Sequence, residues 1–122
     1  MGTKMVSATD LIRVDRVAKA AKRRRFLHRV FTGEELVYAF ARKEPTKHLA
    51  GRFAAKEACM KALGTGWSQG IKWQDIEVRN APGGRPIVLF RDKAKELLSG
   101  RDVNISIAYG GGFAVATAVI FS

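Results

Sequence analysis

Hydrophobic positions recur with helical spacing near the start of the chain, directly after a short predicted strand at Met5–Thr9. This period predicts a helix over residues 11–25 with one apolar face. The apolar face is formed by Leu11, Val14, Val17, Ala18 and Ala21. The opposite face is basic and carries Arg13, Arg16, Lys19 and Arg23. Asp10 precedes the helix at the position of an N-cap, where its carboxylate would accept a backbone hydrogen bond.

Two further helices are predicted before the middle of the chain. Thr32 and Glu35 have the spacing of a capping box, so a short helix is expected to begin after Thr32. Pro45 opens a longer helix that continues to about Leu63, and Gly64 ends it as a C-cap.

The second half of the chain has the period of β-strands. Strands are predicted at Trp73–Arg79, Ile87–Arg91, Val103–Tyr109 and Phe113–Phe121, with a short helix at Asp92–Leu98. Turns at residues 80–84 and 110–112 join these strands in pairs. Phe113–Phe121 is apolar on both faces and is therefore expected to be a central, fully buried strand. The sequence predicts a single α+β domain over residues 1–122, with a mostly antiparallel sheet packed against the long helix.

Composition limits the setting of this domain. Met1–Lys4 precede a second methionine and are expected to be an appended remnant. A single cysteine, Cys59, excludes an internal disulfide framework and a cysteine-based zinc site, and it indicates a reducing compartment. No apolar run is long enough to span a membrane, and the apolar region of a signal peptide is missing. A soluble, cytoplasmic protein with no membrane partner is expected.

The charge indicates the kind of partner. The 22 lysine and arginine residues exceed the 11 aspartate and glutamate residues, which leaves a net charge of +11. Such a field attracts nucleic acids, acidic proteins or phosphorylated small molecules, and charge alone does not choose among them. A nucleic-acid-binding module would explain the charge, but the chain lacks interleaved exposed aromatic residues, a zinc pattern and an RNA-recognition motif. No nucleic-acid partner is therefore expected.

The long helix carries the candidate chemistry. Glu57 and Lys61 are four residues apart and share one helix face. They form either an exposed ion pair or a pair in which the carboxylate binds a hard cation and the lysine meets a phosphate. A magnesium site would need a second carboxylate, and Asp10 is the candidate, with a helix N-cap as its alternative role.

Two other residues of this helix have two interpretations each. Lys56 falls on the apolar stripe, so its side chain either extends along the apolar surface to water or is directed into a phosphate site. Gly64 is a C-cap glycine that would also let the backbone approach a ligand closely.

A family resemblance decides among these alternatives. The long helix and the residues after it contain Leu49-Ala50-Gly51-Arg52-Phe53-Ala54-Ala55-Lys56-Glu57-Ala58, continuing through Lys61-Ala62-Leu63-Gly64-Thr65-Gly66. Shorter matches, in the same order, are Thr9-Asp10, Arg29-Val30-Phe31-Thr32 with Glu35, Trp73-Gln74-Asp75-Ile76-Glu77-Val78, Gly84-Arg85-Pro86 and Ile105-Ser106-Ile107. From about Met5 to Ile120 the chain resembles the holo-acyl-carrier-protein synthases, the short trimeric type of 4′-phosphopantetheinyl transferase.

The resemblance implies a reaction and a set of site residues. The reaction is magnesium-dependent transfer of 4′-phosphopantetheine from coenzyme A to a serine of apo acyl carrier protein, which releases adenosine 3′,5′-bisphosphate. Asp10 and Glu57 would be the protein ligands of Mg²⁺, and Lys61 would offset charge as the phosphoanhydride breaks. The base that takes the serine proton stays open between a water molecule on the metal and a carboxylate such as Glu57. Residues implied in coenzyme A binding are Arg52, Lys61, Gly64, Gly84, Arg85, Pro86, Ser106 and Tyr109.

The resemblance also implies partners. An acidic acyl carrier protein would dock on the basic helix through Arg13, Arg16 and Arg23, for which a solvated basic face is the alternative role. The enzyme would be a homotrimer with active sites between subunits, serving fatty acid biosynthesis in the cytoplasm.

Two positions depart from the family pattern. Ala8 replaces a glycine, which is a minor change. Ala108-Tyr109 stands where the family usually has serine or threonine followed by histidine, and tyrosine has no group that titrates near pH 7. His28 and His48 lie elsewhere in the pattern and are expected at the surface. Tyr109 is the one feature that favours a catalytically weakened homologue, which would bind coenzyme A or a carrier protein without efficient transfer.

Overall fold

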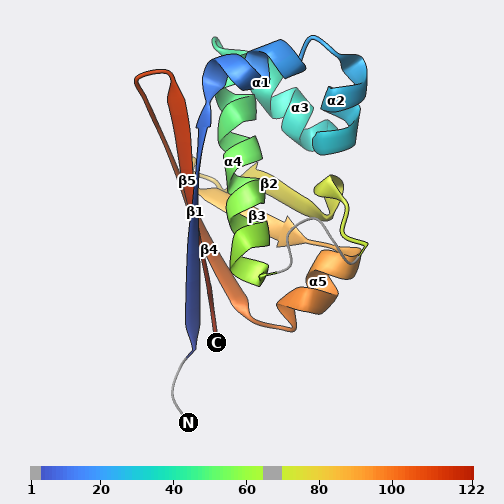
Figure 1. Cartoon of the computed structure of the whole chain (residues 1–122), viewed down its shortest axis with the longest axis vertical. Coiled ribbons are helices and arrows are strands. Elements are labelled where there is room, and N and C mark those ends of the chain that lie inside the picture. The colour runs from blue at the N-terminus through green and yellow to red at the C-terminus, as the bar shows by residue number, and fades with distance from the viewer. Residues whose placement is uncertain (1–3, 65–69) are drawn as a thin grey trace.

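A three-stranded antiparallel sheet forms one side of the molecule. The computed structural model describes residues 4–64 and 70–122. Strands β1 (Met5–Arg13), β4 (Asp102–Gly110) and β5 (Phe113–Phe121) pair in the order β1-β5-β4. Helix α4 (Pro45–Leu63) packs across one face of this sheet (Figure 1). The predicted α+β fold, the long helix and its end at Gly64 are confirmed, since Gly64 is a left-handed C-cap with a φ of 83°.

The central strand β5 is buried on one face only. Its inner side chains Ala114, Ala116, Ala118 and Ile120 are buried, whereas Val115, Thr117, Val119 and Phe121 are partly exposed. The central position was predicted correctly, but burial on both faces was wrong, because no layer of the described chain covers the outer face. On the same outer face of β1, Met5 is 68% exposed and Leu11 is 63% exposed.

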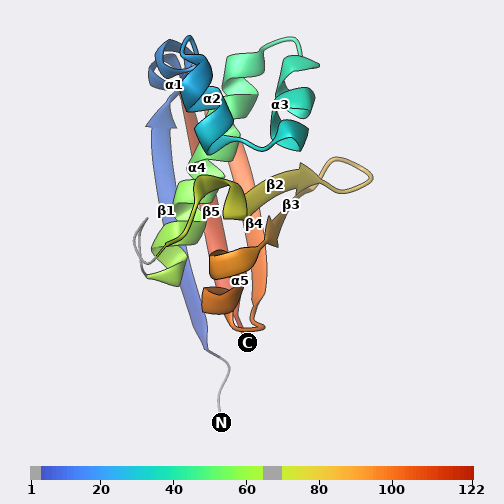
Figure 2. The same cartoon turned by 90° about the vertical axis from the view of Figure 1, so that its right-hand side faces the viewer.

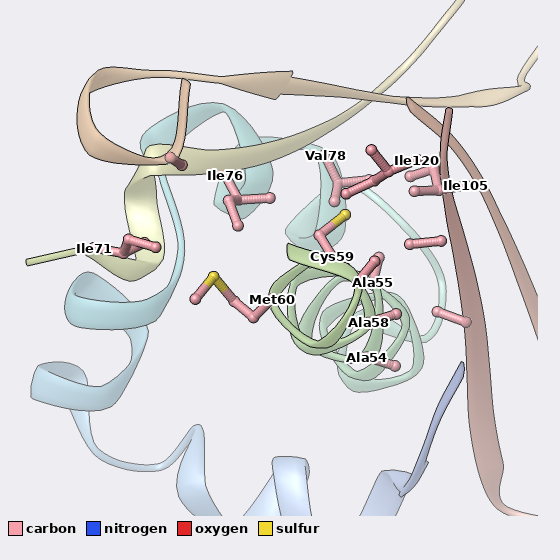
Figure 3. Close-up of a cluster of buried hydrophobic side chains, with 14 residues drawn as sticks. Ala54, Ala55, Ala58, Cys59, Met60, Ile71, Ile76, Val78, Ile105 and Ile120 are labelled. Carbon is pink, nitrogen blue, oxygen red and sulfur yellow. The ribbon is translucent and has the colours of Figure 1, made fainter. Parts of the chain in front are cut away.

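Small side chains line the contact between α4 and the sheet. Ala54, Ala55 and Ala58 of α4 are fully buried, and they belong to one core cluster with Ala116 and Ala118 of β5. Figure 3 shows this cluster around the axis of α4. Because alanine projects only a methyl group, the helix backbone can approach the sheet closely.

A second, two-stranded hairpin covers the other side of α4 (Figures 1 and 2). It consists of β2 (Ile76–Asn80) and β3 (Pro86–Phe90), and helix α5 (Asp92–Leu98) follows. The predicted strand from Trp73 begins only at Ile76. Residues Trp73–Asp75 form a 3₁₀ turn (η1), because the Asp75 carboxylate accepts a hydrogen bond from the backbone of Lys72 at 2.9 Å.

The predicted helix over residues 11–25 is wrong at residues 11–13 and 21–23 and is confirmed at Val14–Ala20. Strand β1 continues to Arg13, whose partner in β5 is Phe113, so sheet pairing overrides the local helical pattern. Two short helices follow instead, α1 (Val14–Ala20) and α2 (Arg24–Val30). Asp10 is therefore a strand residue opposite Ala116 and caps no helix.

The predicted capping box is confirmed at the start of helix α3 (Gly33–Phe40). The Glu35 backbone donates to the Thr32 hydroxyl at 3.2 Å, and the Thr32 backbone donates to Glu35 Oε1 at 2.9 Å. The second carboxylate oxygen of Glu35 accepts a hydrogen bond from the Val78 backbone at 2.7 Å, so this residue also joins α3 to β2.

Lys56 has neither of its expected roles. Its side chain and that of Glu35 are both fully buried, and Lys56 Nζ lies 2.9 Å from Glu35 Oε1. The ammonium also donates to the carbonyl of Trp73 at 3.0 Å and to that of Ile76. Burial lowers the pKa of Lys56, and the charge of Glu35 opposes this effect. Lys56 is thus a structural cross-link among α4, α3 and β2.

Removing one member of this pair should be costly. Lys56→Met leaves Glu35 buried without its counter-charge, and we expect a loss of about 3–5 kcal/mol in the free energy of unfolding. Urea denaturation measures this loss, and Lys19→Met, on the exposed face of α1, serves as the matched control. A loss below about 1 kcal/mol for Lys56→Met would show that the pair contributes little.

Candidate functional site

Asp10 and Lys61 meet between β1 and α4. The alternation of β1 places Asp10 on the face that α4 covers, with its side chain 14% exposed. Lys61 Nζ reaches across from α4 and lies 2.8 Å from Asp10 Oδ1 and 3.3 Å from the Thr9 carbonyl. The hydrogen bond to Asp10, together with the charges of Asp10 and Glu57, raises the pKa of Lys61. The lysine is therefore a stable cation at neutral pH.

Glu57 lies one helical turn before Lys61 and faces the same space as Asp10. Both carboxylates line a cavity of about 420 Å³ between β1, α1 and α4. The other lining residues include two arginines and an apolar floor, namely Arg13, Arg16, Val17, Phe26 and Phe53. The structure thus brings together both predicted metal ligands and two of the three predicted docking arginines. Arg23 is exposed just before α2 and does not line this cavity.

The donor set of this cavity fits a hard cation that also binds substrate oxygens. Two carboxylates are the usual protein contribution to a magnesium site, and substrate phosphates and water complete the shell. Within residues 4–64 and 70–122, no cluster of three or more His, Cys, Asp or Glu side chains could hold a metal by itself. The residues present therefore fit Mg²⁺ as a partner of a phosphorylated substrate.

Arg52 lies in the interior, on another side of α4. It is 2% exposed, its guanidinium stacks on the Tyr38 ring at 3.9 Å, and Nη2 donates to Asn80 Oδ1 at 2.6 Å. The Asn80 amide in turn donates to the carbonyl of Gly84 at 2.9 Å. Arg52 is too deeply buried to present its guanidinium at the surface of the single chain. It holds the turn that carries Gly84, Arg85 and Pro86.

Tyr109 packs directly against α4. A Cβ atom on Gly51 would lie 2.2 Å from the Tyr109 hydroxyl, so position 51 must be glycine while this ring is in place. Tyr109 lines a second cavity of about 270 Å³, together with Glu44 and Lys47. Burial raises the pKa of the Tyr109 hydroxyl, which therefore remains protonated.

The remaining predicted residues are spread over the molecule. Ser106 lies on the outer face of β4, opposite Thr117, whereas Tyr109 points to the inner face. Gly64 ends α4, about one turn after Lys61. Thr65 and Gly66 of the signature are outside the described residues. Sequence reasoning missed Tyr38 and placed His48 at the surface, although His48 is half-buried between two tyrosine rings.

Comparison with known proteins agrees with this arrangement. The family model of the 4′-phosphopantetheinyl transferase superfamily matches residues 8–118. The chain belongs to this superfamily. A holo-[acyl-carrier-protein] synthase of Protochlamydia amoebophila is 46% identical over 112 residues, which cover 90% of this chain and 92% of the relative.

Solved structures of phosphopantetheinyl transferases share the whole fold. A holo-(acyl-carrier-protein) synthase from Bacillus anthracis, in complex with CoA (3′,5′-ADP), is 36% identical with a TM-score of 0.82 and covers 98% of this chain and 99% of its own. The Helicobacter pylori holo-[acyl-carrier-protein] synthase, in complex with coenzyme A, is 29% identical with a TM-score of 0.82, covering 93% of this chain and 98% of its own. Within the described residues, this member of the superfamily has no helix long and apolar enough to cross a membrane.

The Tyr109–Gly51 contact can be tested by a double-mutant cycle. Gly51→Ala should destabilise the protein by about 1–3 kcal/mol, because the new methyl group displaces a rigid ring. In a Tyr109→His background the same change should be neutral or stabilising, since alanine favours a helix over glycine by up to about 1 kcal/mol. Urea unfolding of the four proteins gives the coupling.

Gly33→Ala, at the start of α3, is the control for this cycle, because a Cβ atom on Gly33 would have no neighbouring atom within 4 Å. Equal effects of Gly51→Ala in both backgrounds would exclude the steric contact as the reason for glycine at position 51.

Proposed function

We propose that this transferase moves 4′-phosphopantetheine from coenzyme A to a serine of an apo acyl carrier protein, with Mg²⁺, and releases adenosine 3′,5′-bisphosphate. The observation that carries the proposal is the meeting of Asp10, Glu57 and Lys61 beside a basic surface. The relatives named above are holo-acyl-carrier-protein synthases, and two of the similar structures are complexes with coenzyme A or its nucleotide part, which supports the same substrates here.

The chain's own residues position and neutralise charge. The carrier serine attacks the phosphorus that bears pantetheine, and the bond from that phosphorus to the oxygen of the nucleotide phosphate breaks. Asp10 and Glu57 would hold Mg²⁺, which when bound would offset the charge of the phosphate oxygens. Lys61 is a cation held at this place by Asp10, and it would move toward the leaving phosphate as charge develops there. Glu57 is one candidate to accept the serine proton.

The carrier protein would approach over α1 and α2. Arg13 is 60% exposed and pairs with Asp15, while Arg16 lines the cavity that contains Asp10 and Glu57. Further cations on this surface are Lys19, Lys22, Arg23, Arg24 and Arg25. A serine presented by an acidic protein on this surface would meet the cavity directly, because the same α1 residues belong to both.

We further propose a homotrimer with sites between subunits. Arg52 and Glu57 are five residues apart, so their side chains diverge by about 140° around α4. Asp10 lies on β1 and Tyr109 on β4, at opposite edges of the sheet. The turn between β2 and β3 contains Gly84, and Figure 2 shows this hairpin on the β4 side. The outer sheet face also exposes Met5 and Leu11. A second copy packed on this face would cover it. It would also bring Asp10, Glu57 and Lys61 of one copy beside the turn of the other copy that contains Gly84.

The proposed carrier-protein partner and the single cysteine support a pathway and a cellular compartment. Acyl carrier protein appears in the names of the relatives, which supports a role in fatty acid biosynthesis. Cys59 is buried and has no disulfide within the described residues, which supports a reducing compartment such as the cytoplasm.

The two carboxylates should be essential for transfer. Asp10→Asn and Glu57→Gln are each expected to lower the rate by about 100-fold or more, because the cation would lose half of its protein ligands. Intact mass spectrometry of the apo carrier protein, with coenzyme A and a magnesium titration, measures the transfer. Glu96→Gln, an exposed carboxylate on α5, is the control.

Two results would count against this assignment. Near-parental activity of either variant at low magnesium would remove that residue from the site. A parental protein that binds coenzyme A but adds no phosphopantetheine to the carrier would instead be a weakened homologue.

Intersubunit sites predict complementation between two inactive variants. Glu57→Gln and Arg85→Glu alter different halves of the proposed site. When both are co-expressed and purified through two tags, about a third of the sites, one in each mixed trimer, would combine two intact halves. Activity should therefore return in the mixed protein, although each variant alone is inactive. If each site lay within one chain, mixing would restore nothing.

A further inference from the structure

His48 lies between two tyrosine rings on the opposite side of α4 from Glu57. Its imidazole makes an edge contact with Tyr38 of α3 at 5.7 Å between ring centroids and another with Tyr109 of β4 at 5.8 Å. These contacts hold the ring by its carbon framework. Within residues 4–64 and 70–122, no hydrogen bond engages either imidazole nitrogen, so both remain available for a ligand.

The surroundings of His48 are strongly basic. Burial lowers the pKa of His48, and the cations Lys47, Arg52 and Arg42 lower it further, while Glu44 alone opposes them. The guanidinium groups of Arg42 and Arg52 both lie over the Tyr38 ring, at 4.2 and 3.9 Å from its centroid. Lys47 lies 5.0 Å from the centroid of Tyr109. The free protein therefore holds a neutral histidine among three cations, of which Lys47 has the Glu44 carboxylate 4.0 Å from its Nζ.

An anion bound here would reverse this balance. A phosphate monoester carries close to two negative charges at neutral pH, and its approach to Lys47 and Arg42 would offset the repulsion that these cations exert on an imidazolium. The protonated ring would then donate hydrogen bonds that the neutral ring cannot. Tyr109 cannot take up a proton in this way, because its hydroxyl is already protonated and its raised pKa keeps it uncharged at physiological pH.

We propose that His48 helps to bind coenzyme A. Its ring takes up a proton from solvent when the phosphorylated nucleotide end of coenzyme A binds beside it. The proposal rests on the function proposed above, since it needs coenzyme A as the ligand. It adds a pH-dependent contact to substrate binding. The affinity for the nucleotide should fall as the pH rises through the pKa that His48 has in the complex, because above that pH the bound ring is neutral.

Nuclear magnetic resonance of the two histidines tests the proton uptake directly. The imidazole signals of His48 and His28 are followed against pH, in the free protein and in its complex with adenosine 3′,5′-bisphosphate. We expect the pKa of His48 to be higher in the complex. His28 is exposed on α2 and supplies the internal control, because the ligand should leave its signals unchanged.

Affinity measurements with matched variants complete the test. His48→Phe retains an aromatic ring against Tyr38 and Tyr109 but carries no proton, and His28→Phe is the control. Calorimetry should show that His48→Phe weakens binding of the bisphosphate about fivefold or more at pH 6.5 and little at pH 8.5, since couplings of this kind typically change affinity by about 5–150-fold. Runs in two buffers of different ionisation enthalpy should show less proton uptake for His48→Phe than for the parent.

The outcomes separate the two proposals. If the bisphosphate binds while the pKa of His48 stays constant or falls, the inference on His48 is wrong and the proposed transfer stands. Equal weakening of His48→Phe at both pH values would also overturn it, because the ring would then act only through packing. If neither the bisphosphate nor coenzyme A binds to the parental protein, the proposed function fails, and the inference fails with it.

Discussion

The buried ion pair between Lys56 and Glu35 fixes the rotation of α4, and the geometry of the site depends on that rotation. Lys56 contacts Glu35 and two backbone carbonyls, and Glu35 also accepts hydrogen bonds from the Thr32 and Val78 backbones. A buried charge tolerates few alternative arrangements, because an unpaired partner is costly. Neighbouring helix residues are rotated by about 100°, so Glu57 is directed away from this pair and toward β1. The same interaction that joins three elements therefore also directs the face of α4 that carries Glu57 and Lys61 toward Asp10.

Local signals in the sequence predicted the elements that depend on local chemistry. The Thr32–Glu35 capping box and the left-handed Gly64 are formed by neighbouring residues, and both are present as expected. The helix expected over residues 11–25 starts later than predicted because Arg13 pairs with Phe113, a strand partner about a hundred residues away in the chain. The role of Lys56 failed for a related reason, since its partner comes from another helix. Periodicity contains no information on such distant partners.

The candidate site also divides into features that neighbouring residues determine and features that distant partners determine. Helical spacing alone placed Glu57 beside Lys61. Asp10 was a candidate that the spacing left open against a helix N-cap, because its approach depends on how β1 packs on α4. The cluster around His48 had no recognisable signal, since it joins α3, α4 and β4 through rings that a linear pattern does not relate. Helix α4 is common to both regions. It presents the carboxylate cluster at one edge of the sheet and the basic aromatic cluster at the other. A single rigid helix therefore sets how far apart one chain holds the two half-sites, each of which the proposed trimer would complete with a neighbouring copy.

The alanine-lined contact between α4 and β5 has a consequence for how this protein can change over generations. Four buried alanines line this contact, namely Ala54, Ala58, Ala116 and Ala118. A larger side chain at any of them would push the helix away from the strands. A larger residue there would widen the gap that Lys61 bridges to reach Asp10, even if the domain still folded. Selection for transfer should therefore hold these positions small more strictly than selection for stability does, and neutral drift should concentrate on the solvent-facing surfaces of α3 and α5.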